Sequence, residues 1–184
     1  THVLDPATVL VDGTVYLYYS AVRPGCSRSV CLATSTDGVR FTKWEANPVA
    51  LGGGPEVVYR EGTFHLYYWG PAPSSDGFAL YGAASTNGAD FEIIGTKPVL
   101  PTGAPGEWDS HTVETPRIFE DRGLYYMVYC GSDRHDDYPD AAGLAVSDDL
   151  VNWRKYEGNP IFRRGEPGSW DEGAIWFATV ERIG

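Results

Sequence analysis

Residues 5–20 read DPATVLVDGTVYLYYS, and the same pattern returns twice further along the chain. Residues 55–68 read PEVVYREGTFHLYY, and residues 114–129 read ETPRIFEDRGLYYMVY. Each copy places an acidic residue within two positions of a proline, then a short turn ending in glycine, then a run of aromatic and aliphatic residues. Runs of this composition joined by such turns are typical of β-hairpins. The chain is therefore predicted to repeat one hairpin-based unit.

The repeat extends beyond the hairpin. Each copy continues into a segment of small residues that ends in serine, at Ser35, Ser85 and Ser147. Each copy then closes on a polar residue before a proline, at Pro48, Pro98 and Pro160, so the spacings are 50 and 62 residues. Each unit holds four short candidate strands, and no stretch has a sustained helical period of apolar residues. Four strands in a repeat of this length predict a propeller blade.

The predicted fold is therefore all-β, a β-propeller of four-stranded blades. We expect blades at about residues 1–50, 51–101 and 102–162, with part of a fourth at 163–184. Three blades and a part cannot close a ring, although closure is how propellers remove exposed sheet edges. We therefore expect residues 1–184 to form a single propeller domain or fragment, which self-associates or receives its missing blades from a longer chain.

Composition excludes several classes of function. The formal net charge of −11 argues against nucleic-acid and anionic-membrane partners, because both reward basic surfaces. No run of 18 apolar residues is present, so no membrane span is expected. Cys26 and Cys31 could form a bridge, but two free thiols are favoured. The localisation stays open, with a secreted or periplasmic location favoured over a cytoplasmic one.

The motifs resemble those of a known enzyme superfamily. The segments that carry the likeness are Asp5-Pro6 with its hairpin, GPEVVYREG at 54–62, ETP at 114–116 and GLAVSDDLVNW at 143–153. Together they resemble the five-bladed propeller glycosidases grouped around glycoside hydrolase family 43, with families 32, 68, 117 and 130 as relatives. The resemblance covers nearly the whole chain and is specific for the superfamily rather than for one member.

The resemblance implies a pair of catalytic carboxylates near the propeller axis. Asp5 would act as the base or nucleophile, and Glu114 would act as the general acid. Glycosidases use two such groups, and their separation distinguishes inverting from retaining enzymes. The alternative interpretation of Asp5 is a turn residue at a strand entry, and that of Glu114 is a surface residue at a strand end.

Four further residues are candidates for substrate binding: Glu56, Asp109, His111 and Arg117. Asp109 could also be a packing residue between blades, because its Trp-Asp motif at 105–109, PGEWD, recurs at 167–171 as PGSWD. His111 could contact a sugar hydroxyl, bind the axial calcium ion that some relatives hold, or be a hydrogen-bonded buried histidine. No metal site is predicted from the sequence. No cofactor is expected to be required, with a structural calcium ion as an option.

The sequence thus predicts a family 43-like glycoside hydrolase that acts on an oligosaccharide or glycoside by paired acid and base chemistry. The alternative is a non-catalytic carbohydrate-binding or scaffold propeller, which the lack of a clear third carboxylate favours. Family 130 enzymes have Glu-Asp-Pro-Arg where this chain has Glu114-Thr115-Pro116-Arg117. Because the acid in that family is the Asp, Thr115 argues against mannoside phosphorolysis.

Overall fold

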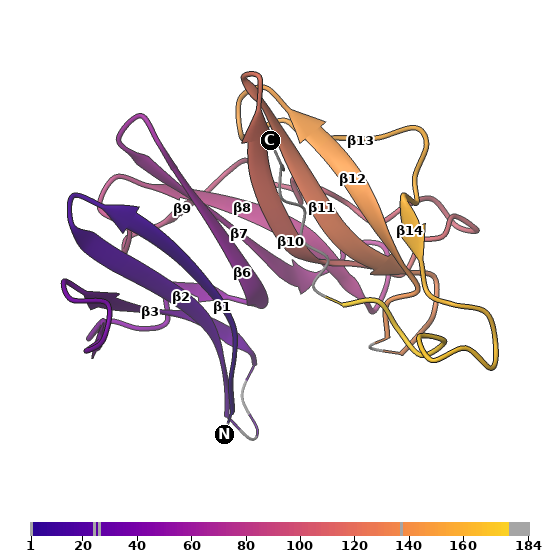
Figure 1. Ribbon diagram of the computed structural model, residues 1–184, viewed down its shortest axis with the longest axis horizontal. Coiled ribbons are helices and arrows are strands. Elements are labelled where there is room, and N and C mark those ends of the chain that lie inside the picture. Colours follow the sequence, from indigo (N-terminus) through magenta and orange to yellow (C-terminus); the bar gives the residue numbers. More distant parts are fainter. Residues whose placement is uncertain (1, 24, 26, 137, 177–184) are drawn as a thin grey trace. The chain divides into compact units, whose positions relative to one another are not determined.

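The computed structural model describes residues 2–23, 25, 27–136 and 138–176, and in this part of the chain it contains strands and no helix (Figure 1). The prediction of an all-β fold is therefore confirmed. Consequently, none of the described segments is a helix that could span a membrane. Cys31 and Cys130 are free thiols, whereas Cys26 lies outside the described residues.

The strands form three antiparallel sheets, each following chain order. The first sheet has the order β1-β2-β3-β4, with β5 pairing to β3. Its strands are β1 (His2–Val11), β2 (Thr14–Val22), β3 (Ser29–Ser35), β4 (Thr42–Lys43) and β5 (Ala50–Leu51). The second sheet consists of β6 (Gly53–Arg60), β7 (Thr63–Pro71), β8 (Phe78–Ser85) and β9 (Glu92–Ile93).

The third sheet has the order β10-β11-β12-β13, with β14 pairing to β12. Its strands are β10 (Thr112–Asp121), β11 (Leu124–Ser132), β12 (Ala141–Ser147), β13 (Arg154–Lys155) and β14 (Phe162–Arg163). The sheet therefore repeats the strand plan of the first one, including the short fifth strand.

The hairpin turns have the backbone that the repeat predicts. In all three, both turn residues have positive φ: Asp12 (47°) and Gly13 (78°), Glu61 (50°) and Gly62 (82°), Arg122 (52°) and Gly123 (78°). Two positive φ values define the turn whose twist matches the twist of the flanking strands. The second residue is glycine each time because glycine adopts this conformation without steric cost.

A second local hydrogen-bond pattern recurs at the end of the third strand of each sheet. The hydroxyl oxygen of Ser35, Ser85 or Ser147 accepts a hydrogen bond from the backbone N–H three residues later, at 2.9, 3.0 and 3.0 Å. In the first and third sheets, an asparagine side chain further along the chain forms two hydrogen bonds with the backbone of the third strand. Asn47 bonds both backbone groups of Leu32, and Asn159 bonds both backbone groups of Leu144. These bonds hold the chain against β3 and β12 where it leaves each sheet.

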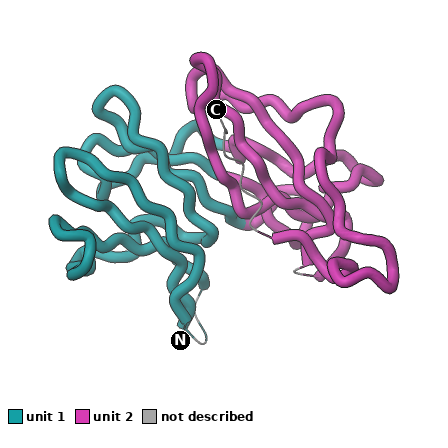
Figure 2. Tube along the Cα trace, viewed as in Figure 1, with its two compact units in different colours: residues 1–70, 81–96 teal, residues 71–80, 97–184 magenta. Residues whose placement is uncertain are grey.

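The chain divides into two compact units, shown in teal and magenta in Figure 2. Unit 1 comprises residues 1–70 and 81–96, and unit 2 comprises residues 71–80 and 97–184. In unit 1, β1 and β2 pack against β6, and the core between the first two sheets contains Tyr18, Leu32, Leu66 and other apolar residues. The Tyr18 hydroxyl donates a hydrogen bond to the Gly88 carbonyl oxygen at 2.6 Å, which ties the two sheets together.

Unit 2 buries the third sheet together with the segments that precede it. Its fully buried side chains include Leu80, Leu100, Val113, Met127 and Tyr129. Leu80 and Leu100 form a backbone bridge in which each N–H donates to the other's carbonyl oxygen. This bridge fastens the chain that leads into β10, the strand that carries Glu114.

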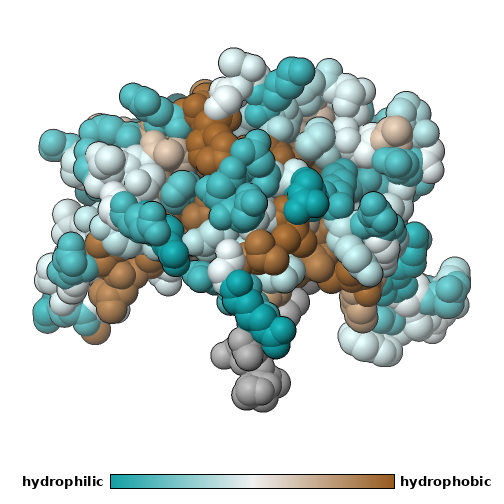
Figure 3. All heavy atoms as spheres, turned by 90° about the horizontal axis from the view of Figure 1, so that it is seen from above, coloured by the Kyte–Doolittle hydropathy of each residue, from teal (hydrophilic) through white to brown (hydrophobic). Residues whose placement is uncertain are grey.

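Large apolar side chains also reach the surface. Figure 3 shows brown, hydrophobic residues at several places between polar ones. Val3, Leu10, Leu51 and Trp170 are the most exposed of these in the first sheet and in the segment after β14, at 64%, 67%, 68% and 96% of their area. In unit 1, a largely apolar pocket of about 300 Å³ lies beside Leu4, Pro6, Leu17 and Phe41.

Candidate functional site

Each first strand is interrupted at its X-Pro pair. The pairing register shifts between Leu4 and Ala7 in β1, between Gly53 and Glu56 in β6, and between Glu114 and Arg117 in β10. The residue before the proline has positive φ each time: 53° at Asp5, 57° at Gly54 and 48° at Thr115. Irregularities of this kind bend a strand and often lie beside functional sites. The three sheets thus share one bulge, and Asp5, Gly54 and Thr115 occupy its equivalent position.

When the three sheets are aligned at the bulge, the three acidic residues do not occupy equivalent positions. Glu114 pairs with Cys130 as Leu4 pairs with Ser20, so Glu114 lies one position before the match of Asp5. Glu56 follows its proline and pairs with Tyr67, as Ala7 pairs with Tyr18. The three acids therefore stand on equivalent strands but at three different positions around the bulge. These positions agree with the offsets from proline in the sequence, since Asp5 directly precedes its proline, Glu56 directly follows its proline and Glu114 lies two residues before its proline.

Asp5 has an oriented carboxylate in unit 1. Its Oδ2 atom accepts a hydrogen bond of 2.9 Å from the Ser20 hydroxyl. The Ser20 oxygen in turn accepts a 2.9 Å hydrogen bond from the Gly54 backbone N–H. Because that oxygen already accepts from Gly54, its proton is available to donate to Asp5. The carboxyl group is half-buried, which leaves room for a substrate or a water molecule beside it.

Two neighbours of Asp5 were not identified as site residues from the sequence. Ser20 appeared only as the last residue of the hairpin motif, and Gly54 only as part of the second motif. Ser20 is fully buried, so its hydroxyl has a fixed environment. The signal that could have revealed both is the register of β1 with β2, which places Ser20 across from Leu4, directly beside the bulge.

Glu56 lies in the same unit as Asp5. It is half-buried on β6, and β6 packs against β1 (Figure 1). The first strands of two neighbouring sheets therefore each bring a carboxylate to the bulge region. This arrangement agrees with a substrate-binding role for Glu56, which stays a prediction.

Glu114 lies in unit 2, where it is 4% exposed. The next residue, Thr115, is 3% exposed, and its hydroxyl has no hydrogen-bond partner in the described part of the chain. Arg117 is half-buried and donates from its guanidinium to the Pro116 carbonyl oxygen at 2.7 Å. Asp5 and Glu114 belong to different units, so their convergence on one pocket remains a prediction.

Asp109 has a contact set that fits a packing role. It is 2% exposed, and its Oδ2 accepts hydrogen bonds from Lys155 Nζ at 2.6 Å and from the Tyr129 hydroxyl at 3.1 Å. Trp108 stacks on the Tyr129 ring with centroids 5.8 Å apart. Burial, followed by the neighbouring Asp109 carboxylate, raises the pKa of Tyr129 well above its usual range. These contacts favour the packing interpretation, and a sugar contact by Asp109 stays a prediction.

His111 lies at the entry to β10 and is 8% exposed. Its Nδ1 atom is 3.4 Å from Oδ1 of Asp76, and the same carboxylate oxygen is 3.4 Å from Nδ1 of His135. The two imidazole rings have centroids 4.4 Å apart. All three residues belong to unit 2. The sequence indicated His111 as a candidate, but nothing in it linked His111 to Asp76 or His135, because the link depends on how the loops fold.

Comparison of the sequence with known proteins finds partial similarity to carbohydrate-active enzymes. No family model matches the chain. It is 35% identical over 109 residues to the 1,2-β-oligomannan phosphorylase of Thermoanaerobacter sp. strain X514, covering 54% of this chain and 34% of that protein. It is also 31% identical over 132 residues to the β-1,2-mannobiose phosphorylase of the same organism, covering 63% and 40%. The chain thus spans about a third to two fifths of these curated relatives.

Solved structures agree on the architecture. A family 117 glycoside hydrolase from Zobellia galactanivorans superposes with a TM-score of 0.69 at 22% identity, covering 88% of this chain and 57% of that one. A thermostable family 43 glycoside hydrolase gives 0.69 at 22% identity, covering 87% and 55%. A member of the family 130 group of mannoside phosphorylases and hydrolases gives 0.60 at 23% identity, covering 84% and 48%. The chain therefore shares its fold with these glycoside hydrolase structures, and the predicted β-propeller fold is confirmed.

Proposed function

We propose that this chain supplies part of an enzyme that cleaves glycosidic bonds in an oligosaccharide, with Asp5 as the base or nucleophile and Glu114 as the general acid. The observation that carries the proposal is the hydrogen-bond chain from the Gly54 N–H through Ser20 to the Asp5 carboxylate. The relatives supply the class of reaction, since they are phosphorylases and glycoside hydrolases that act on carbohydrates.

The backbone conformation at Asp5 is of the kind found where a side chain is held in a fixed orientation for function. A residue other than glycine with positive φ carries a steric cost, and such strain accumulates where the surrounding structure holds a group for function. Asp5 has φ 53° inside a strand, and the proline that follows removes a ladder N–H. The hydrogen bond from the Ser20 hydroxyl fixes the direction in which the Asp5 carboxylate points. Activation of water or attack on a sugar requires a carboxylate held in a fixed orientation.

Glu114 suits the complementary role. A general acid must keep its proton near neutral pH, and glycosidases achieve this by enclosing the group. Glu114 is 4% exposed and lies on the strand of the third sheet that matches the strand of Asp5. Glu56 and Arg117, which flank the same bulge in their own sheets, are proposed to bind sugar hydroxyls.

Phosphorolysis and hydrolysis both need a group that protonates the leaving sugar, and they differ in whether phosphate or an activated water molecule attacks. The similarity to two enzymes named as β-1,2-mannan and β-1,2-mannobiose phosphorylases supports β-1,2-linked manno-oligosaccharides as the first substrates to test. Thr115 at the bulge of the third sheet argues for hydrolysis, because it replaces the acid of the mannoside phosphorylase motif. Phosphate dependence of the reaction distinguishes the two.

The test uses purified protein, β-1,2-mannobiose, and buffers with and without inorganic phosphate. Release of mannose alone indicates hydrolysis, and release of mannose 1-phosphate indicates phosphorolysis. We expect Asp5→Asn to lower the rate by about 10²–10⁴-fold, the usual contribution of one acid or base group. Ser20→Ala should lower it less, because the carboxylate remains. Asp12→Asn, in the exposed turn of the same hairpin, is the matched control and should leave the rate unchanged.

One observation favours a second function, a non-catalytic carbohydrate-binding propeller. Thr115 stands where the third sheet would repeat the carboxylate of Asp5. A binding module would bind oligosaccharides in a calorimeter without turning them over, and its affinity would not depend on an ionised Asp5. Turnover that Asp5→Asn abolishes would exclude this alternative, whereas binding without turnover in the unmodified protein would exclude the enzyme.

A further inference from the structure

Three potential metal ligands meet in unit 2 from three separate segments. Asp76 lies between β7 and β8, His111 immediately precedes β10, and His135 lies between β11 and β12. Each offers one ligand atom, and these atoms all lie within 4.8 Å of one another. The described residues contain no other cluster of this kind.

The distances match a particular coordination geometry. Zinc binds histidine nitrogens and carboxylate oxygens at about 2.0–2.1 Å in a tetrahedron, which places the ligand atoms about 3.3–3.4 Å apart. The Asp76 oxygen is 3.4 Å from Nδ1 of both His111 and His135. Two of the three distances between ligand atoms therefore already fit a tetrahedral zinc site. The third, between the two imidazole nitrogens, can adjust because the His135 side chain is exposed.

His111 supplies an independent reason to expect a ligand. Its side chain is 10% exposed, and its buried Nδ1 makes no hydrogen bond in the described part of the chain. Buried polar atoms without a hydrogen-bond partner are uncommon and call for an explanation. The nitrogen lies 3.4 Å from the Asp76 carboxylate oxygen without forming a hydrogen bond, and this separation suits two ligands of one cation.

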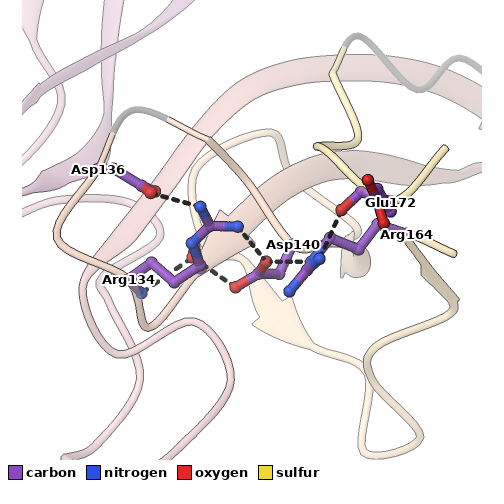
Figure 4. A network of polar contacts seen from close by, with 6 residues as sticks. Arg134, Asp136, Asp140, Arg164 and Glu172 are labelled. Atoms are coloured by element: carbon purple, nitrogen blue, oxygen red, sulfur yellow. Dashed lines mark hydrogen bonds and ion pairs between the residues drawn. The ribbon is translucent and has the colours of Figure 1, made fainter. Parts of the chain in front are cut away.

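The surrounding bonds fix the three segments. The His111 N–H donates to the Ser132 carbonyl oxygen at 3.0 Å, and the His111 carbonyl oxygen accepts from the Ser75 hydroxyl at 2.8 Å. Next to His135, Arg134 bonds Asp136 on one side and Asp140 on the other (Figure 4). Arg164 bonds the same Asp140 carboxylate at 2.6 Å. The loop of His135 is thus tied down at both of its ends.

We propose that Asp76, His111 and His135 bind a divalent transition-metal ion of the zinc class, leaving a fourth position open to water or a hydroxyl group. Two imidazoles and one carboxylate form a ligand set that favours zinc, whereas calcium prefers an all-oxygen shell. The proposed ion therefore differs in kind from the calcium ion for which His111 was a candidate ligand. Bound metal would clamp loops 72–77 and 133–140 to the entry of β10, three residues before Glu114.

Metal-free protein titrated with Zn²⁺ in a calorimeter tests the proposal, with Co²⁺ absorption in the visible range as a report of tetrahedral coordination. We expect one tight site per chain. His135→Ala and Asp76→Asn should each weaken Zn²⁺ binding by at least about 100-fold, since even an outer partner of a ligand is worth 10–100-fold. Both side chains are about four-fifths exposed, so neither variant should disturb folding.

The matched controls are His2→Ala, an exposed histidine elsewhere, and Asp133→Asn, an exposed carboxylate near His135. Both should bind Zn²⁺ like the unmodified protein, and loaded protein should melt at a higher temperature only where the three ligands are intact. The proposal is overturned if the unmodified protein has no stoichiometric Zn²⁺ site. It is equally overturned if His135→Ala and Asp76→Asn bind as tightly as the two controls.

Discussion

The first and third sheets have the same backbone and different chemistry. Both have the same strand order, a short fifth strand, an asparagine that brackets the third strand and a bulge at the same X-Pro pair. At that bulge the first sheet has Asp5 and the third has Thr115, while the acid of the third sheet, Glu114, lies one position earlier. The repeat thus preserves the scaffold and assigns each sheet its own functional group.

The two Trp-Asp turns in unit 2, at residues 105–109 and 167–171, also share a backbone arrangement but differ in the contacts of their side chains. Both turns close with the glycine N–H before the motif, Gly103 or Gly165, donating to the aspartate carbonyl oxygen, at 3.0 and 3.1 Å. Trp108 stacks on Tyr129, and Asp109 is buried against Lys155. Trp170, in the second turn, is 96% exposed. The local sequence makes the turn, and the neighbouring sheet determines whether it is a packing site.

The largest expected effect concerns the acid of the third sheet. Glu114→Gln should slow cleavage of an unactivated disaccharide by about 10²–10⁴-fold, because the leaving sugar needs a proton. A dinitrophenyl glycoside, whose leaving group needs none, should be cleaved nearly as fast as before. Initial rates on both substrates check this, with the exposed Glu120→Gln on the same strand as the control. Equal slowing of the two substrates would contradict the role of Glu114 as an acid.

The next effect separates the two Trp-Asp turns. Asp109→Ala leaves Lys155 without its buried partner, and breaking such a pair costs about 3–5 kcal/mol of unfolding free energy. Asp171→Ala, at the matching position of the second turn, should cost less than about 1 kcal/mol, which is ordinary for a surface site. Urea unfolding followed by tryptophan fluorescence measures both. Similar losses in the two variants would show that Asp109 is not a packing residue.

A third effect depends on pH. Burial alone would raise the pKa of Asp140, but hydrogen bonds from Ser132, Arg134 and Arg164 outweigh it and hold that pKa below its usual range. Since the unfolded carboxyl titrates near pH 3.9, this stabilisation is present above about pH 4 and is lost as pH falls through the lower folded pKa.

Asp140→Asn should therefore lower the unfolding free energy by about 2 kcal/mol at pH 7, a typical value for hydrogen bonds to a charged group. The difference from the unmodified protein should shrink as pH falls below about 4, because Asp140 becomes protonated and is then neutral like asparagine. Melting temperatures from pH 2 to 7 measure this. Asp136→Asn, which removes only the outer partner of Arg134, should change them much less. A constant difference across the range would contradict the electrostatic origin.

The smallest effect on stability is expected at Trp170. Because this side chain is 96% exposed, Trp170→Gln should change the unfolding free energy by less than about 0.5 kcal/mol. The sequence predicts that the chain either self-associates or receives its missing blades from a longer chain. If exposed apolar residues cause self-association, the same change should reduce it. Light scattering over a range of concentrations measures this, and Trp44→Gln on the first sheet is a matched control. A particle size that is independent of concentration would contradict self-association.

Much of the fold and some of the candidate site could be predicted from the sequence. Asp5, Glu114 and Glu56 can be recognised because each lies within two residues of a proline at the head of a repeat. Ser20 and Asp76 cannot, because a serine at the end of a strand and an aspartate in a loop resemble many others. Their partners lie 15 residues away at Asp5 and 35 residues away at His111, and only the strand pairing and loop folding bring them together.

By itself the sequence determined the all-β class, the repeat and the turns at Asp12-Gly13 and after Ser35, because a few neighbouring residues set their backbone conformations. The tertiary structure decided that each X-Pro pair would lie at a bulge, because strand register depends on pairing with a neighbouring strand and not on the residues of one strand alone. It also decided that Asp109 would be buried against Lys155 and that Asp76 would meet two histidines. Contacts of this kind depend on packing between distant segments, which local preferences do not specify.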